Sequence, residues 1–279
     1  MSAIDQGIVM VTGASAGIGE ALATQLASRA KVLILVARRR DRLEALATKL
    51  KATNASLEVS IFECDLTNGT DRERMVKDVD ERHSRVDVLI NNAGVGDMSL
   101  FDLADWKKLD MMIALNVTAL THLTHHFVRG MVARGKGGIL NVSSGFGLVV
   151  MPAFTAYCAT KHYVTGLTEG LAMDLRGTGV TVTQTCPGPV ATEFIDNVGD
   201  NFMGQAPPGL LQISAEKCAR QSLAAFDRRS VLTIPGFVAA LGTYIGAALP
   251  RWFRRLFFGL TSAMIRDKQV AALAAKASA

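Results

Sequence analysis

The chain has 279 residues, of which 49% are hydrophobic and 20% charged. This balance is typical of a globular protein and excludes a disordered or fibrous chain. Its 30 Lys and Arg against 25 Asp and Glu give a net charge of +5, which is too small to indicate a nucleic-acid partner. The four cysteines form no CxxC pair, so we expect neither a disulfide framework nor a zinc site. The first residues show no basic-then-apolar leader, which predicts a cytoplasmic protein.

Short β-branched runs alternate with longer helical stretches along most of the chain. Several runs are almost continuously apolar, as expected of strands that are covered on both faces. The alternation predicts one α/β domain over residues 1–235, with a parallel sheet and helices on both sides. The expected strands are Ile8–Thr12, Val32–Val36, Leu57–Phe62, Val86–Ile90, Ile139–Val142, Val180–Thr185 and Val231–Ile234, and the expected helices are Gly17–Arg29, Arg40–Lys51, Asp71–Arg82, Trp106–Ala133 and Ala156–Leu175.

A glycine-rich loop follows the first predicted strand directly. It reads Thr12-Gly13-Ala14-Ser15-Ala16-Gly17-Ile18-Gly19 and precedes a predicted helix. Three glycines let the backbone pass close to a pyrophosphate, and the helix amino terminus directs N–H groups toward it. A tight turn with close packing is the alternative. The strand–loop–helix context favours a dinucleotide site.

The end of the second predicted strand bears on cofactor specificity. An acid at that point would hold the 2′-hydroxyl of an NAD ribose, but Val32–Val36 runs into Ala37-Arg38-Arg39-Arg40. A guanidinium group pairs with a 2′-phosphate through charge-assisted hydrogen bonds. The sequence therefore predicts NADP(H), with Arg38 as the first candidate and Arg39 as the second. The alternative is that these arginines form a solvated helix start.

Asn116 lies on an otherwise apolar helical stripe. The stripe consists of Leu109, Ile113, Leu120, Leu123 and Phe127. A buried Asn costs about 1–3 kcal/mol unless its amide is hydrogen-bonded. Asn116 therefore has either a structural partner or a task in a site, and both interpretations stay open.

Tyr157 and Lys161 are four residues apart on one predicted helix, so their side chains share a face. A free phenol has a pKa of about 10, which is too high for efficient proton exchange near neutrality. An ammonium group at about 5 Å supplies roughly 3 of the roughly 4 kcal/mol needed to bring that pKa toward 7. We predict an acid/base pair, although Tyr-x-x-x-Lys also occurs by chance.

Ser144 ends the strand that precedes this helix, in the run Asn141-Val142-Ser143-Ser144. Open α/β sheets bind ligands at this carboxyl edge. A hydroxyl there can donate a hydrogen bond to a carbonyl oxygen that becomes an alkoxide. The alternative is a turn serine that bonds to the loop backbone.

In chain order, these motifs resemble those of the short-chain dehydrogenase/reductase family in its non-extended branch. The resemblance covers roughly residues 5–235 and includes Thr12-Gly13-x-x-x-Gly17-x-Gly19, Asn91-Asn92-Ala93-Gly94, Asn116, Ser144, Tyr157-x-x-x-Lys161 and Pro187-Gly188. It implies a single Rossmann-type, doubly wound parallel sheet of about seven strands. It also implies an oxidoreductase acting on a small-molecule alcohol or carbonyl, and a homodimer or homotetramer.

The resemblance implies a role for each matching residue. Tyr157 would be the general acid in reduction and the base in oxidation, while Lys161 would lower its pKa and hold the nicotinamide ribose. Ser144 would polarise the substrate carbonyl, and Asn116 would support a water that relays protons to Lys161. Asp65 would meet the adenine. The expected cofactor contacts are Gly13, Ser15, Gly17, Ile18, Gly19, Arg38, Arg39, Asp65, Leu66, Asn92, Ala93, Gly94, Tyr157, Lys161, Pro187, Gly188, Val190 and Thr192.

By the same resemblance, residues 190–214 form a substrate lid. The apolar Phe194, together with Phe146, Met151 and Phe154, suggests a bulky lipophilic alcohol or ketone that also contacts Ser144. The alternative is that these side chains only pack the lid onto the body.

Residues 236–279 form an apolar and basic extension that we expect to be helical. No charged residue occurs from Ser230 to Pro250, and Arg251-Trp252-Phe253-Arg254-Arg255-Leu256-Phe257-Phe258 follows. A spanning helix needs about 20 apolar residues, and too few remain after Pro235-Gly236 breaks the run. The extension either lies in a membrane interface or docks on the body or a neighbouring subunit, and we favour docking.

Two classes of function stay open: an NADP(H)-dependent oxidoreductase, and a cofactor-binding sensor or scaffold without hydride transfer. The intact set of Asn116, Ser144, Tyr157 and Lys161 favours the enzyme, because a sensor would be free to lose it. His122, His125 and His126 lack the carboxylate or Cys pattern that would complete a metal site. We expect NADP(H) and no metal.

Overall fold

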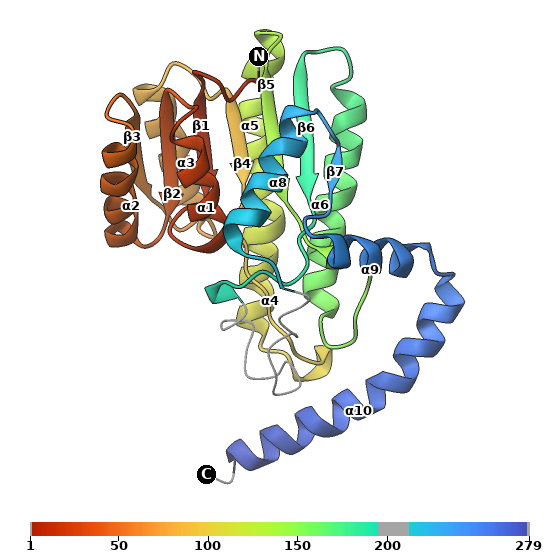
Figure 1. Cartoon of the computed structure of the whole chain (residues 1–279). Helices are drawn as coiled ribbons and strands as arrows, with labels where there is room; N and C mark the ends of the chain where they lie inside the picture. The colour runs from red at the N-terminus through yellow and green to blue at the C-terminus, as the bar shows by residue number, and fades with distance from the viewer. Residues whose placement is uncertain (1, 195–211, 278–279) are drawn as a thin grey trace.

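The computed structural model describes residues 2–194 and 212–277. Within these residues, seven parallel strands form one sheet in the order β3-β2-β1-β4-β5-β6-β7 (Figure 1). The strands are β1 (Ile8–Thr12), β2 (Val32–Ala37), β3 (Glu58–Glu63), β4 (Val88–Asn91), β5 (Gly137–Val142), β6 (Val180–Thr185) and β7 (Leu232–Thr233). The doubly wound Rossmann-type fold with a helical carboxy-terminal extension is confirmed.

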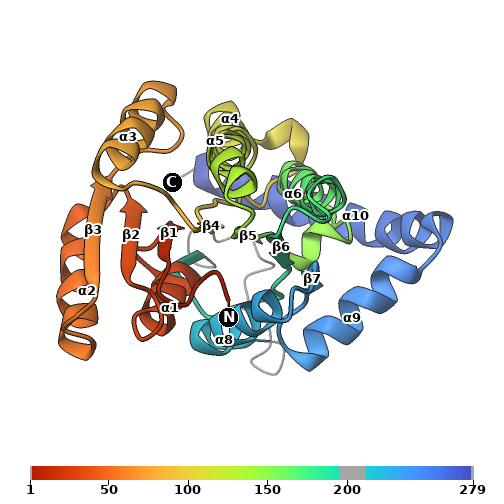
Figure 2. The ribbon, with the colours of Figure 1, turned by 90° about the horizontal axis from the view of Figure 1, so that it is seen from above.

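Helices cover both faces of the sheet (Figure 2). The first face carries α1 (Gly17–Leu26), α2 (Arg40–Thr53) and α8 (Ala215–Asp227). The second carries α3 (Gly69–Arg82), α5 (Leu120–Ala133) and α6 (Thr155–Asp174). Because both faces are covered, a strand such as β2 is buried at every position, which explains its continuous apolar run.

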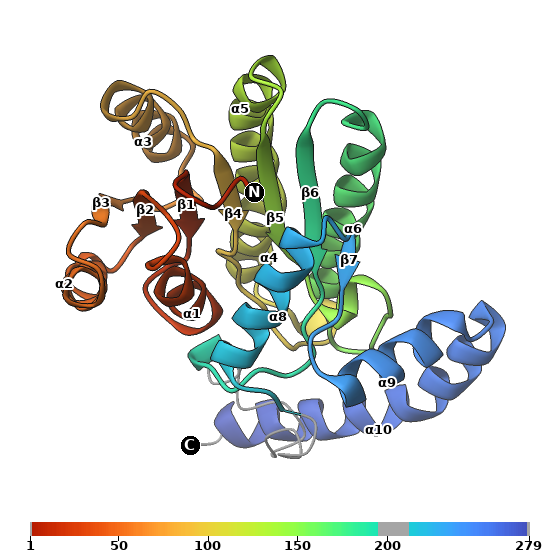
Figure 3. The same cartoon turned by 45° about the horizontal axis from the view of Figure 1, so that its top comes forward.

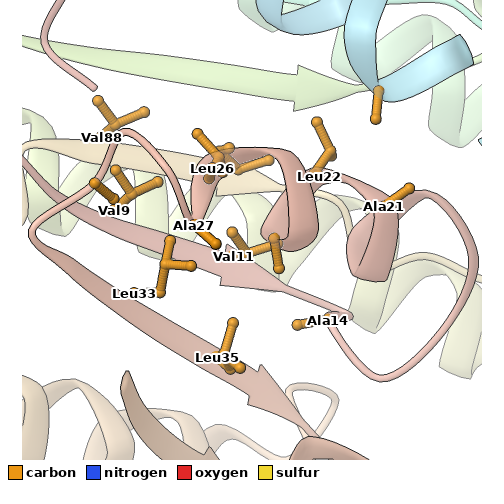
Figure 4. Close-up of a cluster of buried hydrophobic side chains, with 14 of the residues drawn as sticks. Val9, Val11, Ala14, Ala21, Leu22, Leu26, Ala27, Leu33, Leu35 and Val88 are labelled. Atoms are coloured by element: carbon orange, nitrogen blue, oxygen red, sulfur yellow. The ribbon is translucent and has the colours of Figure 1, made fainter. Parts of the chain in front are cut away.

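The core between the sheet and α1 shows how the apolar pattern selects this packing. Val9 and Val11 of β1 and Leu33 of β2 contact the same layer as Leu22 and Leu26 of α1 (Figure 4). All five side chains are fully buried. Alternate strand residues therefore meet one helix stripe, while their neighbours along the strand face the opposite layer.

The strand order reverses between β1 and β4, which are hydrogen-bonded neighbours. At such a point the connections leave toward opposite faces and open a crevice at the carboxyl edge. The glycine loop follows β1, and Asn92 follows β4. The topology thus brings two predicted cofactor segments together.

All seven predicted strands are present, with β1 and β6 at their predicted bounds. The others shift by one or two residues, and the last strand shortens to Leu232–Thr233. The continuous helix predicted over Trp106–Ala133 is wrong. The structure divides it into α4 (Trp106–Ile113), a π-helical turn (Ala114–Ala119) and α5.

The π-helical turn has a local cause in Asn116. Its Nδ2 donates to the carbonyl oxygen of Val95 at 2.8 Å, and its Oδ1 accepts from the amide of Val95 at 3.0 Å. This side chain bonds a neighbouring loop as a backbone strand would. Insertions of this kind widen a helix locally and are frequent beside functional sites.

The extension forms two helices, α9 (Phe237–Ala248) and α10 (Arg251–Ala277). The second half of α10 docks on the body: Ile265 is buried in a cluster with Tyr157, and Gln269 Oε1 accepts from the amide of Leu100 at 2.9 Å. Arg266 forms an ion pair with Asp102. No helix in the described part of the chain is both long and apolar enough to cross a bilayer. Most of the predicted lid, residues 195–211, lies outside the described residues.

Candidate active site

The glycine loop is held at the crevice by the segment after β4. Asn92 Nδ2 donates to the carbonyl oxygens of Thr12 and Gly13 at 2.9 and 3.2 Å. Gly13 has a φ of 65°, and a Cβ there would lie 2.9 Å from Asn92 Nδ2. A Cβ at Gly19 would lie 2.2 Å from the Gly13 carbonyl oxygen. The Asn92 side chain therefore shapes the loop, and glycine is required at both positions.

The amino terminus of α1 is open to a ligand. Its first turn follows Ala16, which supplies no side-chain cap, whereas α3 and α8 begin with Asn68 and Ser214 accepting from their own backbone amides. Uncapped N–H groups and the helix dipole favour an anion. This end of α1 fits a pyrophosphate.

Arginine side chains lie beside the same loop. Arg39 donates from Nε and NH2 to Ser15 Oγ at 3.3 and 3.2 Å, and its NH1 donates to Glu193 Oε2 at 2.9 Å. Arg42 also pairs with Glu193. Arg38 is exposed and lines a surface depression of about 570 Å³. The structure thus places Arg39 nearest the loop, ahead of Arg38.

The third strand delivers Asp65 to the depression that Arg38 lines. Asp65 Oδ1 accepts from the amide and the hydroxyl of Thr67, at 3.0 and 2.8 Å. Leu66 is buried, and its carbonyl oxygen accepts from the guanidinium of Arg72 at 2.8 Å. Arg72 is itself buried, and the sequence gave no sign of it. It fixes the loop that follows β3.

The segment after β6 closes the crevice from the other side. The amide of Gly145 donates to the Pro187 carbonyl oxygen at 2.8 Å. Thr192 lies against the glycine loop, because a Cβ at Gly17 would be 3.0 Å from its Cγ2. Val190 bridges to Ile213. Residues far apart in sequence therefore converge on one edge of the sheet.

Tyr157 is buried at the start of α6, and its hydroxyl hydrogen-bonds to the Ser144 hydroxyl. Burial raises the pKa of Tyr157 above its ordinary value, and the Ser144 hydrogen bond opposes part of that rise. The prediction that Lys161 lowers this pKa is not met in this arrangement. The free-energy cost of ionising a buried phenol exceeds the stabilisation that its neighbours supply.

Lys161 lies one turn further along α6 and is also buried. Its Nζ donates to the Val142 carbonyl oxygen at 2.9 Å and lies 5.8 Å from the centroid of the Tyr157 ring. Burial lowers its pKa to about 8. Ser143 Oγ donates to the Lys161 carbonyl oxygen at 3.1 Å, which fixes this part of α6 to the end of β5.

Asn116 has a structural partner in this arrangement. Besides its bonds to Val95, its Nδ2 donates to Thr160 Oγ1 at 3.1 Å. Its Oδ1 also faces Lys161 across Gly94, where a Cβ would lie 3.2 Å from Asn116 Oδ1 and 3.4 Å from Lys161 Nζ. The water-relay role stays a prediction.

An apolar wall surrounds the Tyr157 ring. Ring centroids of Phe154, Phe194 and Phe146 lie 5.6, 5.7 and 6.4 Å from it. Met151 packs against the same cluster. The structure therefore brings the predicted substrate residues together around the phenol. Phe154 is only 3% exposed, so it supports the wall from behind.

Other parts of this wall were missed by sequence reasoning. Met98 and Leu100, from the loop after β4, belong to the cluster that contains Tyr157, as does Ile265 of α10. Gly96 faces Phe194 and Tyr157, since a Cβ there would lie 2.8 Å from Phe194 Cζ. No local motif marks these residues, because only the path of the chain brings them to the site.

The three neighbouring histidines lie on α5, away from this site. Arg72 donates to His122 Nδ1, and burial with the nearby Arg72 charge lowers the pKa of His122. His126 pairs with Asp80. Among the described residues, no group of three or more His, Cys, Asp or Glu could hold a metal ion.

Comparison with protein-family models matches residues 7–201 to the short-chain dehydrogenase model. The chain belongs to the short-chain dehydrogenase family. An oxidoreductase of Staphylococcus saprophyticus is 33% identical over 74% of this chain and 82% of its own length. The site described above is therefore that of an oxidoreductase whose family uses a nicotinamide cofactor.

Solved structures of other short-chain dehydrogenases share the fold. An enzyme from Sphingobium yanoikuyae in complex with NADPH has a TM-score of 0.76 and 32% identity, over 86% of this chain and 93% of its own. A bulky-bulky ketone specific alcohol dehydrogenase from Comamonas testosteroni has a TM-score of 0.72 and 26% identity, over 88% and 95%. A Burkholderia phymatum enzyme in complex with NAD has a TM-score of 0.76 and 25% identity, over 88% and 94%.

Proposed function

We propose that this short-chain dehydrogenase is an NADP(H)-dependent enzyme that interconverts a lipophilic secondary alcohol and its ketone, or a primary alcohol and its aldehyde. The hydrogen-bonded pair of Ser144 and Tyr157 carries this proposal, because it sits at the carboxyl edge of the sheet inside an apolar wall. A cofactor-binding sensor would not need such a pair. We therefore favour the enzyme.

The chemistry divides between the cofactor and the protein. The nicotinamide supplies the hydride in reduction and accepts it in oxidation. Ser144 orients the substrate oxygen, and Tyr157 donates its phenolic proton to that oxygen as the carbonyl is reduced. Lys161 places positive charge behind Tyr157 and favours proton release. The glycine loop and the open end of α1 hold the pyrophosphate, while Thr192, Pro187 and Gly188 enclose the nicotinamide.

The preference for NADP(H) rests on Arg39. Ser15 holds this guanidinium beside the glycine loop, and β2 ends without a carboxylate that would repel a 2′-phosphate. The Glu193 carboxylate occupies the same guanidinium. A 2′-phosphate takes over this position on Arg39, and Arg38 adds a second cation at the exposed edge. The NADPH complex of the Sphingobium relative agrees with this choice, whereas the Burkholderia relative was solved with NAD.

The cofactor preference gives the first prediction. Arg39→Ala should weaken NADPH binding at least about tenfold, because it removes a charge-assisted pair with the 2′-phosphate, and should leave NADH binding within about twofold. Fluorescence titration of both reduced cofactors measures this. Arg40→Ala is the matched control, since Arg40 pairs with Glu44 on α2. Equal losses for the two cofactors would contradict the assignment.

The aromatic wall supports a bulky substrate. Phe146, Phe154 and Phe194 surround Tyr157, and the Comamonas relative is named for bulky ketones. We expect kcat/KM for bulky aromatic ketones to exceed that for small polar carbonyls at least about tenfold, because the wall gains from apolar burial. A panel of ketones and aldehydes with NADPH measures the ratio. A clear preference for small polar substrates would contradict this prediction.

The division into a domain of residues 1–235 and an extension of residues 236–279 is part of the proposal, as is the lid over residues 190–214. The homodimer or homotetramer implied by the family resemblance stays a prediction, and light scattering measures it. The cytoplasmic location also stays a prediction.

A further inference from the structure

Helix α9 has its large and small side chains on opposite sides, with the small ones inward. A Cβ at Gly188 would lie 2.7 Å from Ala239 Cβ, one at Gly145 would lie 3.2 Å from Thr243 Oγ1, and one at Gly246 would lie 3.2 Å from Val149. These contacts bring the small face of α9 against the loops that follow β5 and β6. No residue of α9 is buried.

The opposite side of α9 presents a stripe of large apolar side chains. Phe237, Leu241, Tyr244 and Ile245 are 81%, 51%, 53% and 54% exposed. Their spacing puts them on one face of the helix. An ordinary surface helix has the reverse arrangement, with apolar residues toward the body. This stripe is therefore built to meet something other than water.

The start of α10 continues the exposed surface and adds positive charge. Trp252, Leu256 and Phe257 are 67%, 59% and 54% exposed. Arg251 and Arg255 are exposed between and beside them. The sequence contains no acidic residue from Arg228 to Arg266. We call the α9 stripe together with residues 251–257 the α9–α10 surface.

The α9–α10 surface is fixed to the body at both ends. In Figures 1 and 3, α9 projects away from the sheet beside β7, and α10 turns back beneath the carboxyl edge. The small face of α9 holds the first end, and Ile265, Gln269 and the Arg266–Asp102 pair hold the second. The exposed side chains are thus displayed on an anchored element.

Charge selects among the surfaces that could cover these residues. A two-fold contact with a second copy buries the same patch from both chains, so arginines would meet arginines with no acidic residue from this region between them. An anionic bilayer supplies the missing negative charge, and aromatic side chains favour the headgroup level. The 12 residues of α9 extend only about 18 Å, against a hydrocarbon core of about 30 Å. The fit is to a bilayer surface that the helix does not cross.

We propose that the α9–α10 surface binds the surface of an anionic lipid bilayer. The stripe of α9 and the aromatic residues of α10 enter the headgroup region, and Arg251, Arg254 and Arg255 pair with lipid phosphates. This proposal does not depend on the cofactor or the substrate. It replaces the expectation that the whole extension docks on protein, since only the second half of α10 does so in the described residues.

Sedimentation of the full chain with vesicles tests the proposal without any cofactor. We expect at least about tenfold tighter binding to phosphatidylcholine vesicles that contain phosphatidylglycerol than to phosphatidylcholine alone. The double variant Trp252→Ser/Leu256→Ser should lose most of this binding, and so should Arg254→Glu/Arg255→Glu. Their matched controls are Trp106→Ser/Met173→Ser, which removes apolar side chains of similar exposure elsewhere, and Arg74→Glu/Arg220→Glu.

Each outcome of this experiment decides the proposal. Binding that the controls keep and the surface variants lose supports it, provided that the surface variants unfold at the wild-type temperature. Absence of wild-type binding, or equal binding to both kinds of vesicle, overturns it. Light scattering identifies the competing occupant: if the wild type ignores vesicles and the surface variants dissociate an oligomer, the surface covers a second copy. NADPH titration of the same preparations keeps a failure here distinct from a failure of the proposed function.

Discussion

Replacing Tyr157 with Phe is expected to lower kcat for ketone reduction at least about 100-fold while NADPH binding stays within about twofold of the wild type. The variant removes only the hydroxyl that donates the proton, and general acids contribute roughly 100- to 10,000-fold to rates. The ring keeps its contacts with Phe154 and Phe194. Single-turnover kinetics with NADPH and a bulky ketone, together with fluorescence titration, measure the two quantities.

A second tyrosine on the same helix provides the control. Tyr163 is 40% exposed, and its hydroxyl bonds to Thr121 away from the crevice. Tyr163→Phe should leave both the rate and NADPH binding unchanged. If Tyr157→Phe keeps the wild-type rate, another group donates the proton. A rate that is undetectable even in the wild type, with NADPH still bound, would support the sensor alternative.

The sheet could be predicted from sequence because its signals are local. Continuous apolar runs mark strands that are covered on both faces, and β1 and β6 fall where such runs begin and end. The break between α4 and α5 could not be predicted, since the stripe that contains Asn116 continues through it. The cause is a hydrogen bond to Val95, and a periodic pattern carries no information about that partner.

The candidate site shows the same division between local and distant information. The glycine loop and the pair of Tyr157 and Lys161 lie within single elements, so spacing alone located them. Glu193 on Arg39 and Ile265 beside Tyr157 join residues more than 100 positions apart, and no motif predicts such contacts. Sequence reasoning also weighed the charge of Lys161 without the burial of Tyr157. Burial has the larger effect on that phenol.

Lys161 makes the pH dependence of the enzyme a sharp test of this balance. Burial lowers its pKa to about 8, so the ammonium is charged below that pH and neutral above it. Burial raises the pKa of Tyr157, so its phenol stays protonated through the same range. The group that titrates near neutrality is therefore Lys161. The charge that assists proton release from Tyr157 disappears as the pH rises through about 8.

Ketone reduction should accordingly show a kcat/KM that is level below about pH 7 and falls as the pH rises through about 8. In Lys161→Met the side chain keeps a similar length and has no charge, so the rate should be at least about 30-fold lower at pH 7 and level across the range. Lys217→Met, on the exposed side of α8, should keep the wild-type profile. Kinetics from pH 6 to 10, with circular dichroism to verify folding, measure all three proteins. A fall near pH 8 that persists in Lys161→Met would assign the titration to another group and remove Lys161 from the acid/base pair.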